Sequence, residues 1–239
     1  MLNSKTVRNR LFIFIRLSLI ASIAVNIVLA VAAIYRDKVI TKVEIATEVT
    51  KRVELVAWAV LTLVLSFGSD YVERKEKIDI PDVLEICIVV FIYAGLYLSE
   101  RFNLYNRYFW WDDLLHTLSG VIMGFIGFIV IYTINRRYSI NLNPLLVALF
   151  SFNFAITLGV MWEILEFTSD VFFRTASQKW DLPDTAILLG KSYQGSGLRD
   201  TMSDLIVDSI GALITSFITY FLYKNKRIKT LNRMEKMFI

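Results

Sequence analysis

Long apolar blocks separated by short charged stretches dominate the pattern of this chain. The blocks fall at residues 11–35, 53–69, 83–99, 113–134, 144–167 and 201–223. A transmembrane helix needs about 20 consecutive, mostly apolar residues, so each block is long enough, or nearly so, to cross a membrane. The pattern therefore predicts an all-α fold, a polytopic transmembrane helical bundle of about six spans.

The composition agrees with this interpretation and leaves little room for a soluble part. The chain has 239 residues, 56% of them apolar, and a mean hydropathy of +0.54. We therefore expect a single membrane domain over residues 1–239. Residues 1–100 contain the first three predicted spans and show no evident chemistry, whereas residues 110–224 contain the last three spans and the most unusual polar residues.

The basic residues flank the apolar blocks, which accounts for a formal net charge of +4 without a nucleic-acid partner. Cytoplasmic loops of membrane proteins are enriched in Lys and Arg, and the C-terminal tail holds the largest group of them here. We expect a multi-pass protein of the cell membrane with both termini in the cytoplasm. The first block contains Arg16 and exceeds the apolar core of a signal peptide, so we interpret it as a retained span.

Charged residues also occur where a membrane protein normally avoids them, near the ends of the last three spans. Within each span they are three or four positions apart, which places them on one face of a helix. A carboxylate facing lipid costs about 2.5–3.5 kcal/mol at the bilayer centre, so these side chains must face protein, water or an ion. The residues are Asp113 and His116 in the fourth span, Glu163 and Glu166 in the fifth, and Asp200, Asp204 and Asp208 in the sixth.

These three groups are expected to meet. The start of the fourth span, the end of the fifth and the start of the sixth lie on one side of the membrane in either orientation. Histidine and carboxylates on facing helices are a known way to build a metal site in a helical bundle. One histidine with several carboxylates suits a divalent ion, Zn²⁺, Mn²⁺ or Fe²⁺, and the residue types do not select among these metals.

This interpretation gives a hypothesis for the role of each residue. The metal ligands would be His116, Glu166, Asp200 and Asp204. The general base would be Glu163 or Asp208, acting on a metal-bound water or a substrate hydroxyl. The substrate-binding residues would be Arg199, Lys191, Gln194 and Asp113, with Arg199 and Lys191 contacting an anionic group such as phosphate. The expected partners are membrane lipid and a lipid-linked or anionic small-molecule substrate.

Simpler explanations exist for single members of this set. Acidic residues and serines at the start of a helix often cap its free N–H groups, and a histidine or carboxylate can be hydrogen-bonded or solvated without further function. Asp204 and Asp208 resist such explanations because they lie one and two turns inside the sixth span, and Glu166 is equally hard to explain in this way. Capping applies to Asp112, Asp113, Asp200 and Ser203, ordinary burial to His116, and solvation to Glu163 and Asp170.

At these residues the chain resembles a known group of proteins. The segments HTLSG, WEILEF and QGSGLRDTMSDLIVDSIGA are similar to the signatures of the YjdF-like family of integral membrane proteins, over residues 110–212. A looser similarity is to the VanZ-like proteins, a family linked to glycopeptide-antibiotic resistance, although the arginine spacing differs. The resemblance implies a shared polar core and supplies no reaction. The matching positions are His116, Glu163, Glu166, Gln194, Asp200, Asp204 and Gly211.

Three classes of function remain open from the sequence. We favour a metal-dependent membrane hydrolase or headgroup transferase that acts on a lipid-linked substrate. The first alternative is a cation- or proton-coupled transporter, for which polar residues should continue through the opposite half of the bundle; Thr215, Ser216 and Thr219 are mild candidates. The second is a non-catalytic membrane scaffold or a resistance or immunity-type protein with a structural polar core.

Overall fold

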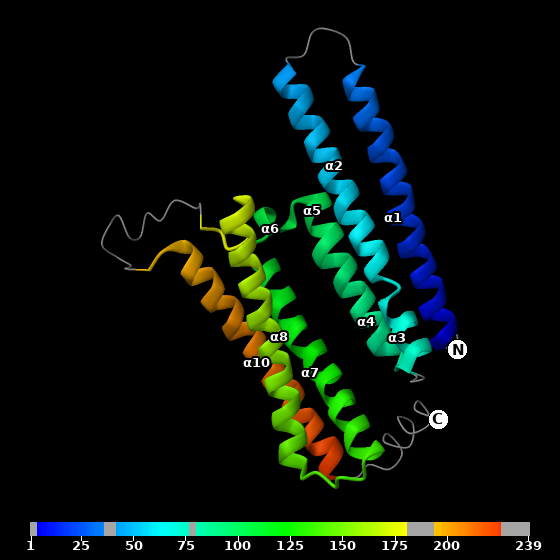
Figure 1. Cartoon of the computed structure of the whole chain (residues 1–239), viewed down its shortest axis with the longest axis vertical. Helices are drawn as coiled ribbons and strands as arrows, with labels where there is room; N and C mark the ends of the chain where they lie inside the picture. Colours follow the sequence, from blue (N-terminus) through cyan, green and yellow to red (C-terminus); the bar gives the residue numbers. More distant parts are fainter. Residues whose placement is uncertain (1–3, 36–41, 77–79, 181–193, 226–239) are drawn as a thin grey trace. The chain divides into compact units, whose positions relative to one another are not determined.

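The computed structural model describes residues 4–35, 42–76, 80–180 and 194–225. All regular secondary structure in these residues is helical, and six segments are long and apolar enough to cross a membrane (Figure 1). The helices are α1 (Ser4–Ile34), α2 (Lys42–Leu65), α3 (Gly68–Glu76), α4 (Asp82–Ile92), the π-helix η1 (Tyr93–Leu98), α5 (Ser99–Phe102), α6 (Leu104–Arg107), α7 (Trp111–Arg137), α8 (Pro144–Phe173) and α10 (Ser196–Lys224). The fold class predicted from the hydrophobic pattern is confirmed.

Several helices extend beyond the apolar blocks that predict them. The second span begins at Lys42, well before the predicted start at residue 53. Its added turns are charged, and they are supported by an i,i+4 ion pair between Arg52 and Glu48 and by a hydrogen bond from Arg52 to Asn26 of α1. Hydropathy therefore marks the apolar part of this helix, whereas its charged turns continue beyond that part with support from side-chain pairing.

The helices before Phe109 form one compact unit. In this unit α1 packs against α2 and α4, and the π-helix η1 lies against α2. Arg16 donates to the carbonyl of Ser66 at 2.6 Å and to Asp70 at 2.7 Å, which bridges the break between α2 and α3. The apolar core consists of Phe12, Ile15, Leu19, Ala59, Val89 and Tyr97.

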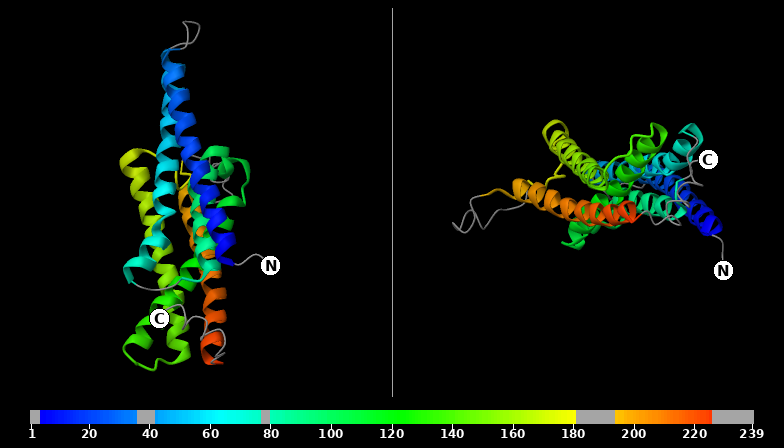
Figure 2. Two further views of the ribbon diagram at one scale, coloured as in Figure 1. Left: turned by 90° about the vertical axis from the view of Figure 1, so that its right-hand side faces the viewer. Right: turned by 90° about the horizontal axis from the view of Figure 1, so that it is seen from below.

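A second compact unit begins at Trp110 and contains α7, α8 and α10. Each of these helices packs against the other two. Figure 2 shows the helices in two further views. Glycines bring α7 and α10 into backbone contact: a Cβ on Gly120 would collide with the carbonyl of Asp208, and one on Gly211 with the carbonyl of Thr117. This contact fixes the separation of α7 and α10 where their polar residues face each other.

Candidate metal centre

His116 lies in the second turn of α7 and is only 7% exposed. The helix begins at Trp111 without a side-chain cap, so neither Asp112 nor Asp113 caps it. Likewise α10 begins at Ser196 after Gly195, which places Asp200 and Ser203 inside the helix. The capping explanation is therefore wrong for these residues, and their side chains are available for contacts between helices.

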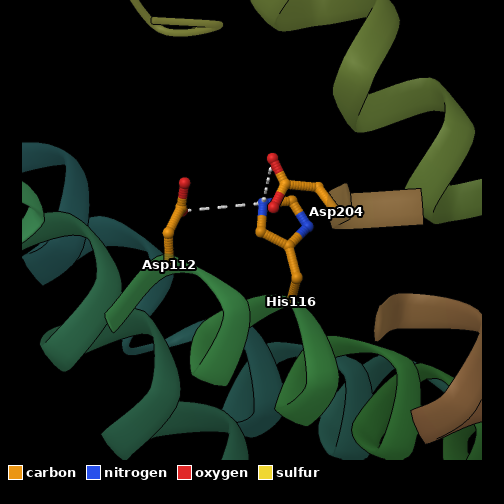
Figure 3. Close-up of side chains that lie close together, drawn as sticks. All are labelled: Asp112, His116 and Asp204. Carbon is orange, nitrogen blue, oxygen red and sulfur yellow. Dashed lines mark ion pairs between the residues drawn. The ribbon is translucent and has the colours of Figure 1, made fainter. Parts of the chain in front are cut away.

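The two nitrogens of His116 have different surroundings. Nδ1 lies 3.2 Å from Oδ2 of Asp208, and since a carboxylate accepts hydrogen bonds, Nδ1 is the donor. Nε2 lies 3.8 Å from Oδ1 of Asp112, 3.9 Å from Oδ2 of Asp204 and 4.0 Å from Oε1 of Glu163. Figure 3 shows the ring between Asp112 and Asp204. A neutral histidine held in this way presents the lone pair of Nε2 to three carboxylates.

Carboxylates from all three helices of the second unit therefore meet at Nε2 of His116: Asp112 of α7, Glu163 of α8 and Asp204 of α10. The ligand atoms of Asp112, His116 and Asp204 all lie within 4.8 Å of one another, which is a spacing that could hold a metal ion. Asp204 is 2% exposed. Carboxylates so close together and so buried repel one another unless a cation or a proton lies among them.

Glu163 gives an independent indication that a ligand belongs here. Its side chain is 4% exposed, and neither of its carboxylate oxygens has a hydrogen-bond partner among the described residues. Oδ1 of Asp208, a residue only 3% exposed, is also without a partner. Buried polar atoms are almost always hydrogen-bonded, because an unpaired one costs about 1–3 kcal/mol. The unpaired oxygens fit a bound cation and its water.

Lys179, from the segment after α8, supplies a positive charge at the edge of this cluster. Its ammonium nitrogen lies 2.5 Å from Oδ2 of Asp112 and 2.6 Å from Oδ1 of Asp200. Burial disfavours the charged ammonium, but these two hydrogen bonds outweigh it and raise the pKa of Lys179 above its ordinary value. The lysine is therefore charged at any physiological pH, and it binds Asp112 on the side away from His116.

Comparison with known proteins places this chain in a family. The family model described as "Predicted membrane protein (DUF2238)" matches residues 17–225. The chain belongs to the DUF2238 family. It is therefore an integral membrane protein, and its six spans agree with that assignment. The match covers all three helices that form the candidate metal centre.

A distant relative of this DUF2238 protein occurs in Thermotoga maritima, where its name is "Uncharacterized protein". The two sequences are 27% identical over 153 residues, which is 64% of this chain and 70% of the relative. No solved structure matches the chain. The comparisons therefore establish family and membrane location, and any statement about chemistry rests on the site itself.

The structure of this DUF2238 protein places the other residues predicted from the sequence as follows. Asp200 pairs with Lys179, and Glu166 accepts a hydrogen bond from the indole of Trp162 at 2.8 Å. Asp113 accepts a hydrogen bond from Ser203 at 3.3 Å. Arg199 and Gln194 are exposed, and Lys191 lies outside the described residues. Among the predicted metal ligands, Asp204 thus lies within 4 Å of His116, while Asp200 and Glu166 contact other partners.

Sequence reasoning gave no chemical role to two residues that contact the cluster. Asp112 precedes His116 by four positions, so the helical spacing that linked Asp113 to His116 also pointed to Asp112. Lys179 had no such signal, because it lies outside the predicted spans and its contacts with Asp112 and Asp200 are distant in sequence. A lysine in a connecting segment becomes a site residue only through tertiary structure.

Gly159 on α8 provides the space that the Asp208 carboxylate occupies. A Cβ at Gly159 would lie 2.7 Å from Oδ2 of Asp208, the atom that accepts from His116. We expect Gly159→Ala to displace this carboxylate and to reduce metal affinity by roughly 10–100-fold, the usual effect of losing an outer-shell partner. Titration of the purified variant with Zn²⁺ or Mn²⁺ measures this loss.

The matched control is Gly68→Ala, because an added Cβ at Gly68 meets nothing within 4 Å. This control should bind metal like the wild type. Equal metal affinity for Gly159→Ala and the wild type would show that Asp208 does not orient His116 in the metal-bound protein.

Proposed function

We propose that this protein is a metal-dependent membrane enzyme, a hydrolase or headgroup transferase acting on a lipid-linked substrate. In this proposal a divalent ion is held by Nε2 of His116 and by the carboxylates of Asp112 and Asp204. Three protein ligands leave a coordination position open, as catalytic metal sites require. The observation that supports the proposal most directly is the buried carboxylate of Glu163: its two oxygens have no hydrogen-bond partner within normal bonding distance among the described residues, and Oε1 lies 4.0 Å from Nε2.

The surrounding residues have distinct roles in this proposal. Asp208 holds the proton of Nδ1 and so fixes the tautomer and orientation of His116. Glu163 is the general base, because its free oxygens face the same side of the ring as the ligand carboxylates. A bound divalent ion would lower the pKa of a coordinated water and polarise a substrate oxygen. Asp200 and Glu166, which the sequence suggested as ligands, lie outside the ligand set in this arrangement.

The resemblance to the YjdF-like family is compatible with this proposal, since His116, Glu163 and Asp204 fall on its matching positions; the looser similarity to the VanZ-like proteins is compatible as well. It favours a common polar centre on the last three spans. The reaction at that centre is inferred from the ligand set and the position of the general base, not from either resemblance.

A transporter would need a polar path through the other half of the second unit. The three candidate residues there have partners within the bundle instead: Thr215 donates to the carbonyl of Val121, Ser216 to that of Ala148, and Thr219 to that of Ser216. Hydroxyls satisfied by nearby carbonyls are common packing elements in membrane helices. The described residues therefore favour a site that is closed on that side.

The experiment is metal analysis of the detergent-purified protein, as isolated and after stripping and reloading, followed by assay in nanodiscs of mixed phospholipids. We expect near-stoichiometric Zn, Mn or Fe and a metal-dependent release or exchange of lipid headgroups, detected by mass spectrometry. Failure to bind any of these metals after reloading would rule out the proposal. Metal binding with cation flux in proteoliposomes, and no change in the lipids, would identify a transporter.

A further inference from the structure

The segment Arg174–Trp180, here called the strap, is fixed at its start by a buried carboxylate. Asp170 near the end of α8 is 8% exposed and accepts hydrogen bonds from Oγ1 of Thr175 at 2.6 Å. It also accepts from the backbone N–H groups of Ser177 at 2.8 Å and Gln178 at 3.0 Å. These bonds turn the chain back toward the helices as soon as α8 ends.

The strap is also held against α10. The side-chain amide of Gln178 donates to Oγ1 of Thr201 at 2.6 Å. A Cβ on Gly197 would lie 3.1 Å from Cβ of Trp180, so glycine allows this close approach. The backbone of Lys179 has a φ of 49°, a left-handed conformation that residues other than glycine rarely adopt. The residues on either side of Lys179, Gln178 and Trp180, thus both contact α10 and fix the position of the lysine between them.

These contacts place the Lys179 ammonium at the edge of the proposed metal site. The two oxygens of Asp112 point in different directions: Oδ1 lies 3.8 Å from Nε2 of His116, whereas Oδ2 lies 2.5 Å from Nζ of Lys179. A single carboxylate therefore connects the metal side of the cluster to the lysine. Asp200 accepts a second N–H of the ammonium at 2.6 Å, and an ammonium has three donors.

We propose that Lys179 is a specificity-determining residue that binds the phosphate group of the substrate, and this inference rests on the proposed function. Asp112 and Asp200 accept from the Lys179 ammonium, so its third N–H could donate to an oxygen of a phosphate group bound at the metal site. The many carboxylates of the cluster repel an anion, so a phosphate group needs a fixed positive charge besides the metal. Charge-assisted hydrogen bonds between ammonium and phosphate are among the strong ones.

The test uses full-length protein loaded with Mn²⁺, which broadens the phosphorus NMR signal of a phosphate group bound beside it. One probe is inorganic phosphate added to the protein in detergent, and the other is phosphatidic acid in phosphatidylcholine nanodiscs that contain the protein. Broadening of phosphatidic acid alone identifies a lipid headgroup as the source of the phosphate. Broadening of inorganic phosphate identifies a site that also accepts the free ion.

We expect Lys179→Met to retain Mn²⁺ but to bind the phosphate probe roughly tenfold or more weakly, because it loses a charge-assisted hydrogen bond. Lys179→Arg should recover most of the phosphate affinity. Arg174→Met is the matched control, since it removes an exposed cation from the same strap and should leave phosphate binding unchanged.

A purely structural role for Lys179 makes a different prediction. If the lysine only neutralises Asp112 and Asp200, the double variant Lys179→Met/Asp200→Asn should bind phosphate like the wild type. Our proposal expects the double variant to bind Mn²⁺ and to bind phosphate as weakly as Lys179→Met does. Recovery in the double variant, or unchanged phosphate affinity in Lys179→Met, overturns this inference alone. The inference is also overturned if the Mn²⁺-loaded wild type broadens the phosphorus signal of neither inorganic phosphate nor phosphatidic acid. A wild type that binds no Mn²⁺, Zn²⁺ or Fe²⁺ overturns the proposed function as well.

Discussion

Replacing His116 with alanine is expected to reduce the affinity for a divalent metal by roughly a hundredfold or more, because losing an outer-shell partner alone costs 10–100-fold. The substitution removes the one nitrogen ligand of the site and leaves three carboxylates, Asp112, Asp204 and Glu163, facing an empty space. Asp208 also loses its hydrogen-bond donor. The measurement is isothermal titration of metal-stripped protein with Zn²⁺ and Mn²⁺, with circular dichroism to show that the helices remain formed.

The remaining substitutions at this site should follow a graded series. Asp204→Asn removes a ligand charge and should weaken metal binding about as much as His116→Ala. Asp208→Asn removes only the outer-shell partner, so its effect should be smaller. Asp70→Asn is the control, because Asp70 is a carboxylate of the first unit that pairs with Arg16. A folded His116→Ala protein with wild-type metal affinity would show that the cluster does not bind metal through Nε2.

Gly211→Leu is expected to destabilise the second unit strongly. Its Cβ alone would collide with the carbonyl oxygen of Thr117 and lie 3.0 Å from the backbone nitrogen of Val121. These are backbone atoms of a neighbouring helix, so no side chain can rotate away to make room. Overpacking of this kind costs about 1–3 kcal/mol for small additions, and a leucine side chain adds more.

The same substitution should also affect the metal centre, because Thr117 follows His116 directly and α7 would have to move away from α10. We therefore expect Gly211→Ala to lower both the unfolding temperature and the metal affinity, and Gly211→Leu to lower both further. Unfolding in detergent followed by circular dichroism, with and without metal, provides the two measurements. Gly68→Leu is the control, since Gly68 has open space around it. An unfolding temperature unchanged in Gly211→Leu would contradict the close helix contact.

The fold could be predicted from the sequence because the solvent imposes it. In a bilayer every backbone polar group must be satisfied within its own helix, so an apolar block of sufficient length has essentially one structure available. All six spans follow from this constraint. The prediction failed at the helix ends, as at Lys42–Arg52 of α2, where charged turns continue the helix through pairing that hydropathy does not register.

The site could be predicted only in part. Residues three apart on a helix are rotated by about 60° from each other, because each residue turns the helix by about 100°. The spacing of Glu163 and Glu166 therefore predicts that both lie on one face of the helix. In the structure Glu163 faces His116, whereas Glu166 accepts a hydrogen bond from Trp162. Spacing along one helix cannot distinguish these two cases, since it does not give the rotation of the helix against its neighbours.

The sequence by itself determined the class of protein, the number of spans and the fact that the last three spans carry their acidic residues on one and the same side of the membrane. Those features depend on hydrophobicity and on the alternation of spans, which are properties of the linear chain. Only the tertiary structure decided that Asp112, Asp204 and Glu163 face Nε2 of His116, that Asp208 lies behind the ring at Nδ1, and that Lys179 reaches Asp112. These contacts depend on helix rotation and on the backbone contact at Gly120 and Gly211, which arise from packing between distant segments.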